Sequence, residues 1–267
     1  MPIDLTNSLS SIGLNQYRSL QSMGSGKSIN SAADNPAGLA ESASFSVQIS
    51  GAAQALSNAQ NASSALNTAQ GGVNQIASDL QGINTLSVQA GNGILTASDK
   101  QAIQTQINQS LQDINQVAQN TQFNGQPLLN GNQSITAQTG PNAGNAQTFS
   151  LPNLSGSALN VSNIDITSSA GQSSALSAVQ NALNSVNSAG ASLGAAQTGL
   201  DIAQSSQAIS QVNASASNSA LSDTNYASAS STLAQSNISQ QAAIYAINMY
   251  NATQKSVLAL LPGNSHA

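Results

Sequence analysis

The chain has 267 residues, of which only 5% are charged and 3% aromatic, although 39% are hydrophobic. Soluble proteins ordinarily carry about 25% charged residues. Four basic residues against nine acidic ones give a net charge of -5, and so few positive charges do not form the basic surface that nucleic acids require. There is no cysteine, and the single histidine, His266, stands next to the end. We therefore expect no disulfide, no Cys- or His-based metal site, no serine–histidine catalytic triad and no cofactor.

The hydrophobic residues are spread along the chain. No run of about 18 apolar residues occurs, so we expect no membrane insertion. The first five residues, Met1 to Leu5, lack the basic and apolar regions of a Sec signal. The length fits one or two domains, and the regular spacing of the apolar residues points to helices.

A long helix is predicted from about residue 45. Apolar or small side chains recur at alternating steps of four and three residues, which is the heptad pattern of a coiled coil. Gly71-Gly72 is expected to interrupt this seam, and Gly91-Asn92-Gly93 to end it in a turn. The seam positions are Phe45, Ile49, Ala52, Leu56, Ala59, Ser63, Leu66, Gln70, Val73, Ala77 and Leu80.

A second helix follows, with Ser98-Asp99 as its predicted cap, and runs to about Thr121. Its apolar stripe consists of Ile103, Ile107, Leu111, Ile114 and Val117. The stretch from about 126 to 172 differs because it is richer in proline and turn sequences. There we predict a small β-hairpin from the runs 134–138 and 148–151, with a further strand at 164–166.

Helix is predicted to resume near Ser173 and to weaken toward Asn218. Its stripe again steps by four and three, through Leu176, Val179, Leu183, Val186, Gly190, Leu193, Gln197 and Leu200. The C-terminal segment carries two stripes on neighbouring faces. One contains Ile238, Ala242, Tyr245, Met249, Ala252, Ser256 and Ala259; the other contains Ile244, Ile247, Asn251, Gln254, Leu258 and Leu261.

The amphipathic N-terminal segment covers only one of these two C-terminal faces, because one partner helix buries one face. We expect a mainly α fold: long antiparallel helices in a coiled-coil-like bundle, a small β-hairpin region, and paired N- and C-terminal helices. An ordinary intramolecular bundle remains an alternative at this point. Exposed apolar surface of this size is typical of assembly, which favours a self-associating structural protein over an enzyme.

Several ordered motifs resemble those of bacterial flagellins. The run from Gly24 to Ala40 resembles the family's S-G-x-x-I-N-S-A signature, and 121–125 resembles T-x-F-N-G. The stretches 138–144, 193–197 and 223–227 resemble Q-x-G-A-N, [IL]-G-A-x-Q and D-A-D-Y-A. Any one motif alone is weak, whereas five in order across nearly the whole chain are specific. The signature residues are Ile29, Asn30, Ser31, Ala32, Asp34, Gly38, Phe123, Asn124, Gly125, Gly194, Gln197, Asp223 and Tyr226.

The resemblance implies a subunit that self-assembles into the flagellar filament for swimming motility. Residues 1–30 and 227–267 would form the inner-tube helices, and 31–226 the outer-tube domain with its hairpin region at 126–172. It also implies export by the flagellar type III apparatus to an extracellular filament, with an export chaperone, cap and junction proteins as partners. The implied assembly residues are Leu5, Leu9, Ile12, Tyr17, Leu20, Ile238, Tyr245, Met249, Val257, Leu258, Leu260 and Leu261.

The chain departs from the family pattern in four places. Before Asn30 it is shorter by roughly two to three helical turns, six residues follow Leu261, and basic residues common near Asp223 are missing. The stretch resembling the innate-receptor contact Q-x-x-R-E-L-A-V-Q carries Asn84, Thr85 and Leu86, where Asn84 stands in place of the arginine. Since an arginine fork is not replaced conservatively by an amide, we expect weak receptor recognition.

Three other functions are alternatives to a filament subunit. A hook–filament junction (hook-associated) protein shares the terminal helices, and a secreted coiled-coil adhesin shares the helical periodicity but does not explain the motif set. A flagellin carrying a metalloprotease needs an H-E-x-x-H motif, which is absent. O-linked glycans, as in some flagellins, would fit the exposed hairpin region, but the sequence singles out no residue for them.

Overall fold

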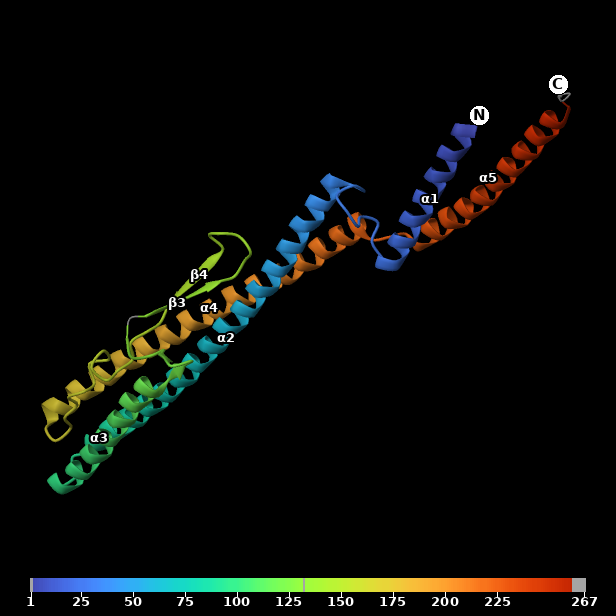
Figure 1. Cartoon of the computed structure of the whole chain (residues 1–267). Helices are drawn as coiled ribbons and strands as arrows, with labels where there is room; N and C mark the ends of the chain where they lie inside the picture. The colour runs from blue at the N-terminus through green and yellow to red at the C-terminus, as the bar shows by residue number, and fades with distance from the viewer. Residues whose placement is uncertain (1, 132, 261–267) are drawn as a thin grey trace. The chain divides into compact units, whose positions relative to one another are not determined.

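The computed structural model describes the backbone of residues 2–131 and 133–260, and the side chains of 6–131 and 133–257 (Figure 1). The helices are α1 Pro2–Ser25, α2 Pro36–Ala90, α3 Ala97–Asn120, α4 Ser169–Ser222 and α5 Tyr226–Leu260. The strands are β1 Gln122–Phe123, β2 Gln126–Pro127, β3 Ser134–Gln138 and β4 Ala146–Ser150. The expected mainly α fold with a small β-hairpin region is confirmed.

The chain divides into two compact units. The terminal unit comprises residues 1–47 and 213–267, and the central unit comprises 48–212. Helices α2 and α4 each contribute to both units. The assignment of residue ranges to an inner and an outer tube is a separate matter and stays a prediction.

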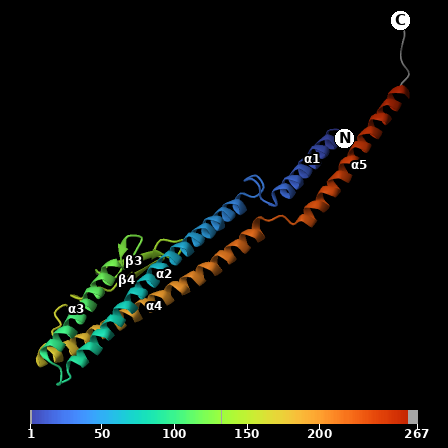
Figure 2. The ribbon, with the colours of Figure 1, turned by 90° about the horizontal axis from the view of Figure 1, so that it is seen from below.

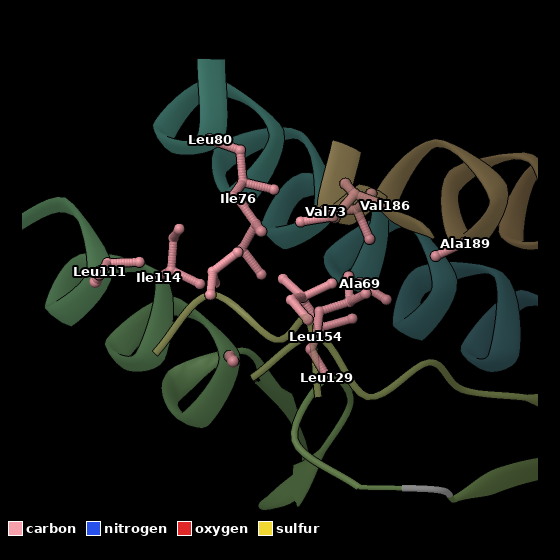
Figure 3. Close-up of a cluster of buried hydrophobic side chains, with 14 of the residues drawn as sticks. Ala69, Val73, Ile76, Leu80, Leu111, Ile114, Leu129, Leu154, Val186 and Ala189 are labelled. Carbon is pink, nitrogen blue, oxygen red and sulfur yellow. The ribbon is translucent and has the colours of Figure 1, made fainter. Parts of the chain in front are cut away.

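The core of the central unit lies along α2, which packs beside both α3 and α4 (Figures 1 and 2). Every predicted seam position of α2 is buried or half-buried. A second set of α2 side chains, spaced seven residues apart, is also buried and therefore faces another neighbour. It consists of Ala55, Ala62, Ala69, Ile76, Ile83 and Ala90. Figure 3 shows side chains of α2, α3 and α4 converging with Leu129 and Leu154 from the loops.

Two glycines in the middle of α2 do not interrupt it, contrary to the prediction. The helix runs unbroken through Gly71 and Gly72. A side chain on Gly72 would lie 2.5 Å from Leu129 Cδ1 and 2.7 Å from Thr121 Oγ1. Gly72 therefore serves close packing against the segment after α3, and tertiary contacts outweigh its low helix propensity.

Helix α3 begins earlier than predicted. Thr96, rather than Ser98 or Asp99, is its N-cap: its hydroxyl accepts from Asp99 N at 3.2 Å, while the Asp99 carboxylate accepts from Thr96 N at 2.9 Å. This reciprocal capping box leaves the predicted stripe intact. Ile103, Ile107, Leu111 and Ile114 are buried, and Val117 packs against the same core.

Two antiparallel hairpins follow α3. In the larger one Ser134 pairs with Ser150 and Gln138 with Ala146, which confirms the predicted run 134–138 and approximately confirms 148–151. The predicted strand at 164–166 does not form. Ile164 and Ile166 are buried, but their backbone groups bind the Gln104 side chain: Nε2 donates to Ile164 O at 2.8 Å, and Oε1 accepts from Ile166 N at 2.8 Å. The Gln104 amide thus satisfies backbone groups that a neighbouring strand would otherwise bind.

Helix α4 starts at Ser169, four residues before the predicted position, and continues to Ser222. Its predicted stripe is correct: Val179, Val186, Leu193 and Leu200 are buried, and the intervening positions are half-buried. In the terminal unit, α1 packs along α5, which confirms the predicted pairing of the terminal helices. The two helices run antiparallel, because Gln16 Nε2 contacts Asn237 and Gln240 while Tyr226 reaches Met23.

Candidate assembly surface

The contact between α1 and α5 combines large apolar residues with small and polar ones. On α1 the half-buried or buried positions facing α5 include Leu9, Ile12, Gly13, Gln16 and Ser19. On α5 they step by four and three through Ala229, Leu233, Ser236, Gln240, Ala243 and Ile247. Sequence reasoning missed this register, because Ser236 and Gln240 carry no hydrophobic signal.

One predicted stripe of α5 points away from α1. Tyr245 follows Gln240 by five residues, which is about 500°, or 140°, around the helix. Ile238, Tyr245 and Met249 are accordingly 68%, 76% and 65% exposed. The stripe from Ile244 to Gln254 lies nearer to α1, and its Ile247 is half-buried there. As expected, α1 covers one face of α5 and leaves the other open.

Exposed apolar side chains also occur on α1 and on the distal part of α5. Leu14, Tyr17 and Leu20 are more than half exposed on α1, and Val257 is 51% exposed on α5. Of the other predicted assembly residues, Leu5, Leu258, Leu260 and Leu261 lie outside the described side chains. Exposed apolar area of this extent is typical of a protein interface.

Hydrogen bonds join the segment 26–28, at the end of α1, to the segment 222–226, at the start of α5. Ser28 N donates to Ser222 O at 2.7 Å, and Thr224 N donates to Gly26 O at 2.9 Å. These two backbone hydrogen bonds flank an isolated antiparallel β-bridge between Lys27 and Asp223. The Tyr226 hydroxyl donates to Met23 O at 2.7 Å. Asp223 and Tyr226 therefore help to hold the end of α1 against the start of α5.

The Ile29–Gly38 motif forms a capped turn before α2. One Asp34 carboxylate oxygen accepts from Asn30 N, Ser31 N and Ser31 Oγ at 3.2, 2.9 and 3.0 Å. The Ser31 hydroxyl and these amides lower the pKa of Asp34, since each favours the charged form. Ala32 is exposed in the same turn.

Helix α2 begins directly after this turn. Asn35 Oδ1 accepts from Gly38 N at 2.9 Å, so Asn35 acts as the N-cap with Pro36 at the first helical position. Ile29 is buried against Gly38, where a Cβ would lie only 2.7 Å from Ile29 Cδ1. The glycine in this signature is thus required by a close contact.

The remaining signature residues lie in the central unit. Asn124 and Gly125 adopt φ of 51° and 76° in the two-residue turn between Phe123 and Gln126, the left-handed conformation that such hairpins need. Gln197 Nε2 donates to Ser63 Oγ at 2.6 Å and so links α4 to α2, whereas Gly194 is exposed.

The stretch resembling the receptor contact lies near the end of α2. Asn84 and Leu86 are half-buried, and the exposed Thr85 donates its hydroxyl proton to Gln81 O at 3.0 Å. No charged side chain stands at 84–86. The expectation of weak receptor recognition stays a prediction.

Comparison with known protein families identifies the family of this chain. The family described as "Bacterial flagellin N-terminal helical region" matches residues 3–134, and "Bacterial flagellin C-terminal helical region" matches 176–261. The chain belongs to the flagellin family. The two matched regions contain the paired helices α1 and α5 and most of the signature residues described above.

Curated relatives of this flagellin-family chain include the flagellin of Serratia marcescens, 36% identical over 178 residues, covering 64% of this chain and 51% of that protein. The flagellin of Clostridium tyrobutyricum is 37% identical over 153 residues, covering 53% of this chain and 41% of that protein. The chain therefore spans about half the length or less of these relatives.

Two solved structures share the fold. Bacillus cereus flagellin has a TM-score of 0.53 and 22% identity, over 57% of this chain and 88% of that one. A putative flagellar hook-associated protein from Vibrio parahaemolyticus has a TM-score of 0.60 and 14% identity, over 70% of this chain and 99% of that one. At these identities the likeness concerns the fold alone.

Two other features are absent from the described part of the chain. Within residues 6–131 and 133–257, no three His, Cys, Asp or Glu side chains gather as they would to hold a metal ion. No described helix is long and apolar enough to cross a membrane. The exposed apolar side chains of α1 and α5 are the candidate assembly surface.

Proposed function

We propose that the chain is a structural subunit that self-assembles into the bacterial flagellar filament and serves swimming motility. The observation that carries this is the outward face of α5, where Ile238, Tyr245 and Met249 are exposed directly opposite the α1 contact. Burying such side chains contributes roughly 1.5–3 kcal/mol each. A contact of this strength, repeated at every subunit, would order the terminal helices into a continuous inner tube.

The proposal includes further steps that the family relationship supports. The assembled protein would be extracellular, delivered by the flagellar export apparatus with its chaperone and joined to cap and junction proteins. It would need no catalytic activity. A hook–filament junction role is the alternative, since the fold is shared with a hook-associated protein. The matches to flagellin family regions at both ends favour the filament subunit.

The test is polymerisation of the purified full chain. Ile238→Gln combined with Tyr245→Gln removes apolar surface from the open face but keeps good helix formers. We expect long filaments from the native chain and none from the double variant at the same concentration, by sedimentation and electron microscopy. Circular dichroism of the monomers should be equal, because both side chains are exposed.

A matched control keeps the face apolar. Ile238→Leu combined with Tyr245→Phe should assemble like the native chain. Filaments of normal length and yield from the glutamine variant would contradict the proposed role of the α5 face. A native chain that forms only short capped assemblies on hooks would instead support the junction protein.

A further inference from the structure

The residue types that helix α4 turns toward α2 change after Leu200. Up to that residue most positions facing α2 are apolar, and Val179, Val186 and Leu193 among them are buried. Beyond it three of the half-buried positions are glutamines, Gln204, Gln207 and Gln211, and the inward apolar residues before Leu221 are only the small Ala203 and Ala214. The large apolar side chains of this part, Ile202, Ile209 and Val212, are instead 66%, 62% and 66% exposed.

The glutamines and the exposed apolar residues occupy opposite faces. At about 100° per residue, Ile209 lies about 20° from Ile202 around the helix axis. Gln207 and Gln211 lie about 140° and 180° from Ile202. The exposed residues follow a 3–4–3 spacing through Ile202, Ser205, Ile209 and Val212, which is the seam pattern of a packed helix.

An isolated chain gains nothing from this arrangement. Polar groups that face a neighbouring helix require partners, and the Gln207 Oε1 atom is buried with none in the described part of the chain. The isoleucines meanwhile remain in water. An amphipathic helix normally turns its apolar stripe toward whatever covers it, so the pattern of α4 indicates that its outward face is covered by something else.

We propose that the face formed by Ile202, Ser205, Ile209 and Val212 is buried by a second copy of this chain in the assembled polymer. This inference rests on the proposed function. It adds a contact in the central unit to that of the terminal helices. The exposed stripe becomes a lateral seam between subunits, and the glutamine face becomes the weaker, intramolecular side.

The size of the stripe argues for a second copy as the occupant. From Ile202 to Val212 the helix advances only about 15 Å, whereas a stable two-protein interface buries about 800 Å² on each partner. A separate protein bound here alone would dissociate readily. A copy already held by other contacts in a polymer needs no such area, because its effective concentration is high.

The charge around the stripe argues in the same direction. Asp201 is the acidic neighbour, and no basic residue stands between Lys100 and Lys255. The face therefore offers nothing to a nucleic acid, an anionic lipid surface or an acidic protein, all of which require positive charge. It matches a neutral surface of the kind that this chain itself presents.

The first test compares Ile202→Gln/Ile209→Gln with the conservative pair Ile202→Val/Ile209→Leu in the full chain. Thermal unfolding of the monomers should be unchanged, because the side chains are exposed. We expect the critical concentration for polymerisation to rise about tenfold or more in the glutamine variant and to stay native in the control. An unchanged critical concentration in the glutamine variant overturns the inference while leaving the proposed function intact. A native chain that never polymerises overturns both.

The second test needs no loss of assembly. The chain contains no cysteine, so Ser205→Cys supplies a single attachment point for a benzophenone maleimide in the middle of the stripe. Polymers of mixed isotopically light and heavy subunits should yield light–heavy crosslinks on irradiation, identified by mass spectrometry, and the monomers none. Assembled polymers that give no crosslink between copies overturn the inference.

Discussion

The terminal and central units of this flagellin-family chain bury very different amounts of apolar surface. Among the described hydrophobic residues, Ile29 and Ala214 are the buried ones of the terminal unit, whereas the whole remaining core belongs to the central unit. Exposed large apolar residues are instead concentrated in the terminal unit. The central unit thus holds a well-buried apolar core, while the terminal helices leave most of their large apolar side chains exposed in the single chain.

The difference in apolar burial between the two units is tested most strongly by truncating one large side chain in each unit. Ile76→Ala removes a fully buried side chain of the central unit and should destabilise the monomer by about 2–5 kcal/mol. Tyr245→Ala in the terminal unit should change it by less than about 0.5 kcal/mol. Urea denaturation followed by circular dichroism measures both; equal losses would mean that the monomer already buries its terminal helices.

Two adjacent glycines sharpen the account of the central core. Gly72→Ala places a methyl group against Leu129 and Thr121 and should cost about 1–3 kcal/mol. Gly71 has no atom within 4 Å of an added Cβ, so Gly71→Ala should stabilise the helix by about 0.5–1 kcal/mol. Thermal melting of the two variants decides this. Effects of the same sign would show that the contact at Gly72 does not exist in solution.

One aspartate in each unit should respond oppositely to acid. Burial raises the pKa of Asp79 on α2, aided by repulsion from Asp113 on α3, although Gln75 donates to its Oδ1 at 3.0 Å. The folded state therefore binds this proton more tightly than the unfolded state. That stabilisation is complete below the ordinary aspartate pKa of about 3.9 and is lost as the pH rises through the raised value.

Asp79→Asn should remove this pH dependence and make the central unit more stable at neutral pH. Asp34 in the terminal unit has a lowered pKa, so its contribution is present above about 3.9 and is lost as the pH falls through the lowered value. Asp34→Asn serves as the control of opposite sign. Denaturation midpoints measured from pH 3 to 7 compare the two variants, and a native slope in Asp79→Asn would refute the assignment.

The smallest effect is expected from salt. With four basic residues in the chain, we expect contacts between copies of either unit to be apolar packing and neutral hydrogen bonds, which salt screens hardly at all. The critical concentration should differ by less than about threefold between 0.05 and 0.5 M NaCl, whereas filaments of an arginine-rich flagellin should show a larger change. A steep dependence here would indicate that Arg18, Lys27 or Lys255 holds an interface.

Much of the helical architecture followed from local pattern. The heptad spacing of α2, α3 and the first half of α4 correctly identified the buried positions, because burial of one apolar face is the main force on an amphipathic helix. The run 134–138 was correctly predicted as a strand, because its residues alternate and turn residues flank it. Errors arose at Ser98, Gly71-Gly72 and Ile164–Ile166, where a side-chain cap, a packing contact and the Gln104 amide decided the local structure.

By itself, the sequence determined the family, the helical fold, the pairing of the terminal helices and their surplus of apolar surface. Repeated spacing and ordered motifs can be recognised without knowing which residues are in contact. Only the tertiary structure decided which face is turned to which partner. The α1–α5 contact runs through Ser236 and Gln240, and α4 turns its glutamines inward past Leu200. Hydrophobicity predicts which residues avoid water, but whether a neighbour in the same chain or in another copy covers them depends on geometry.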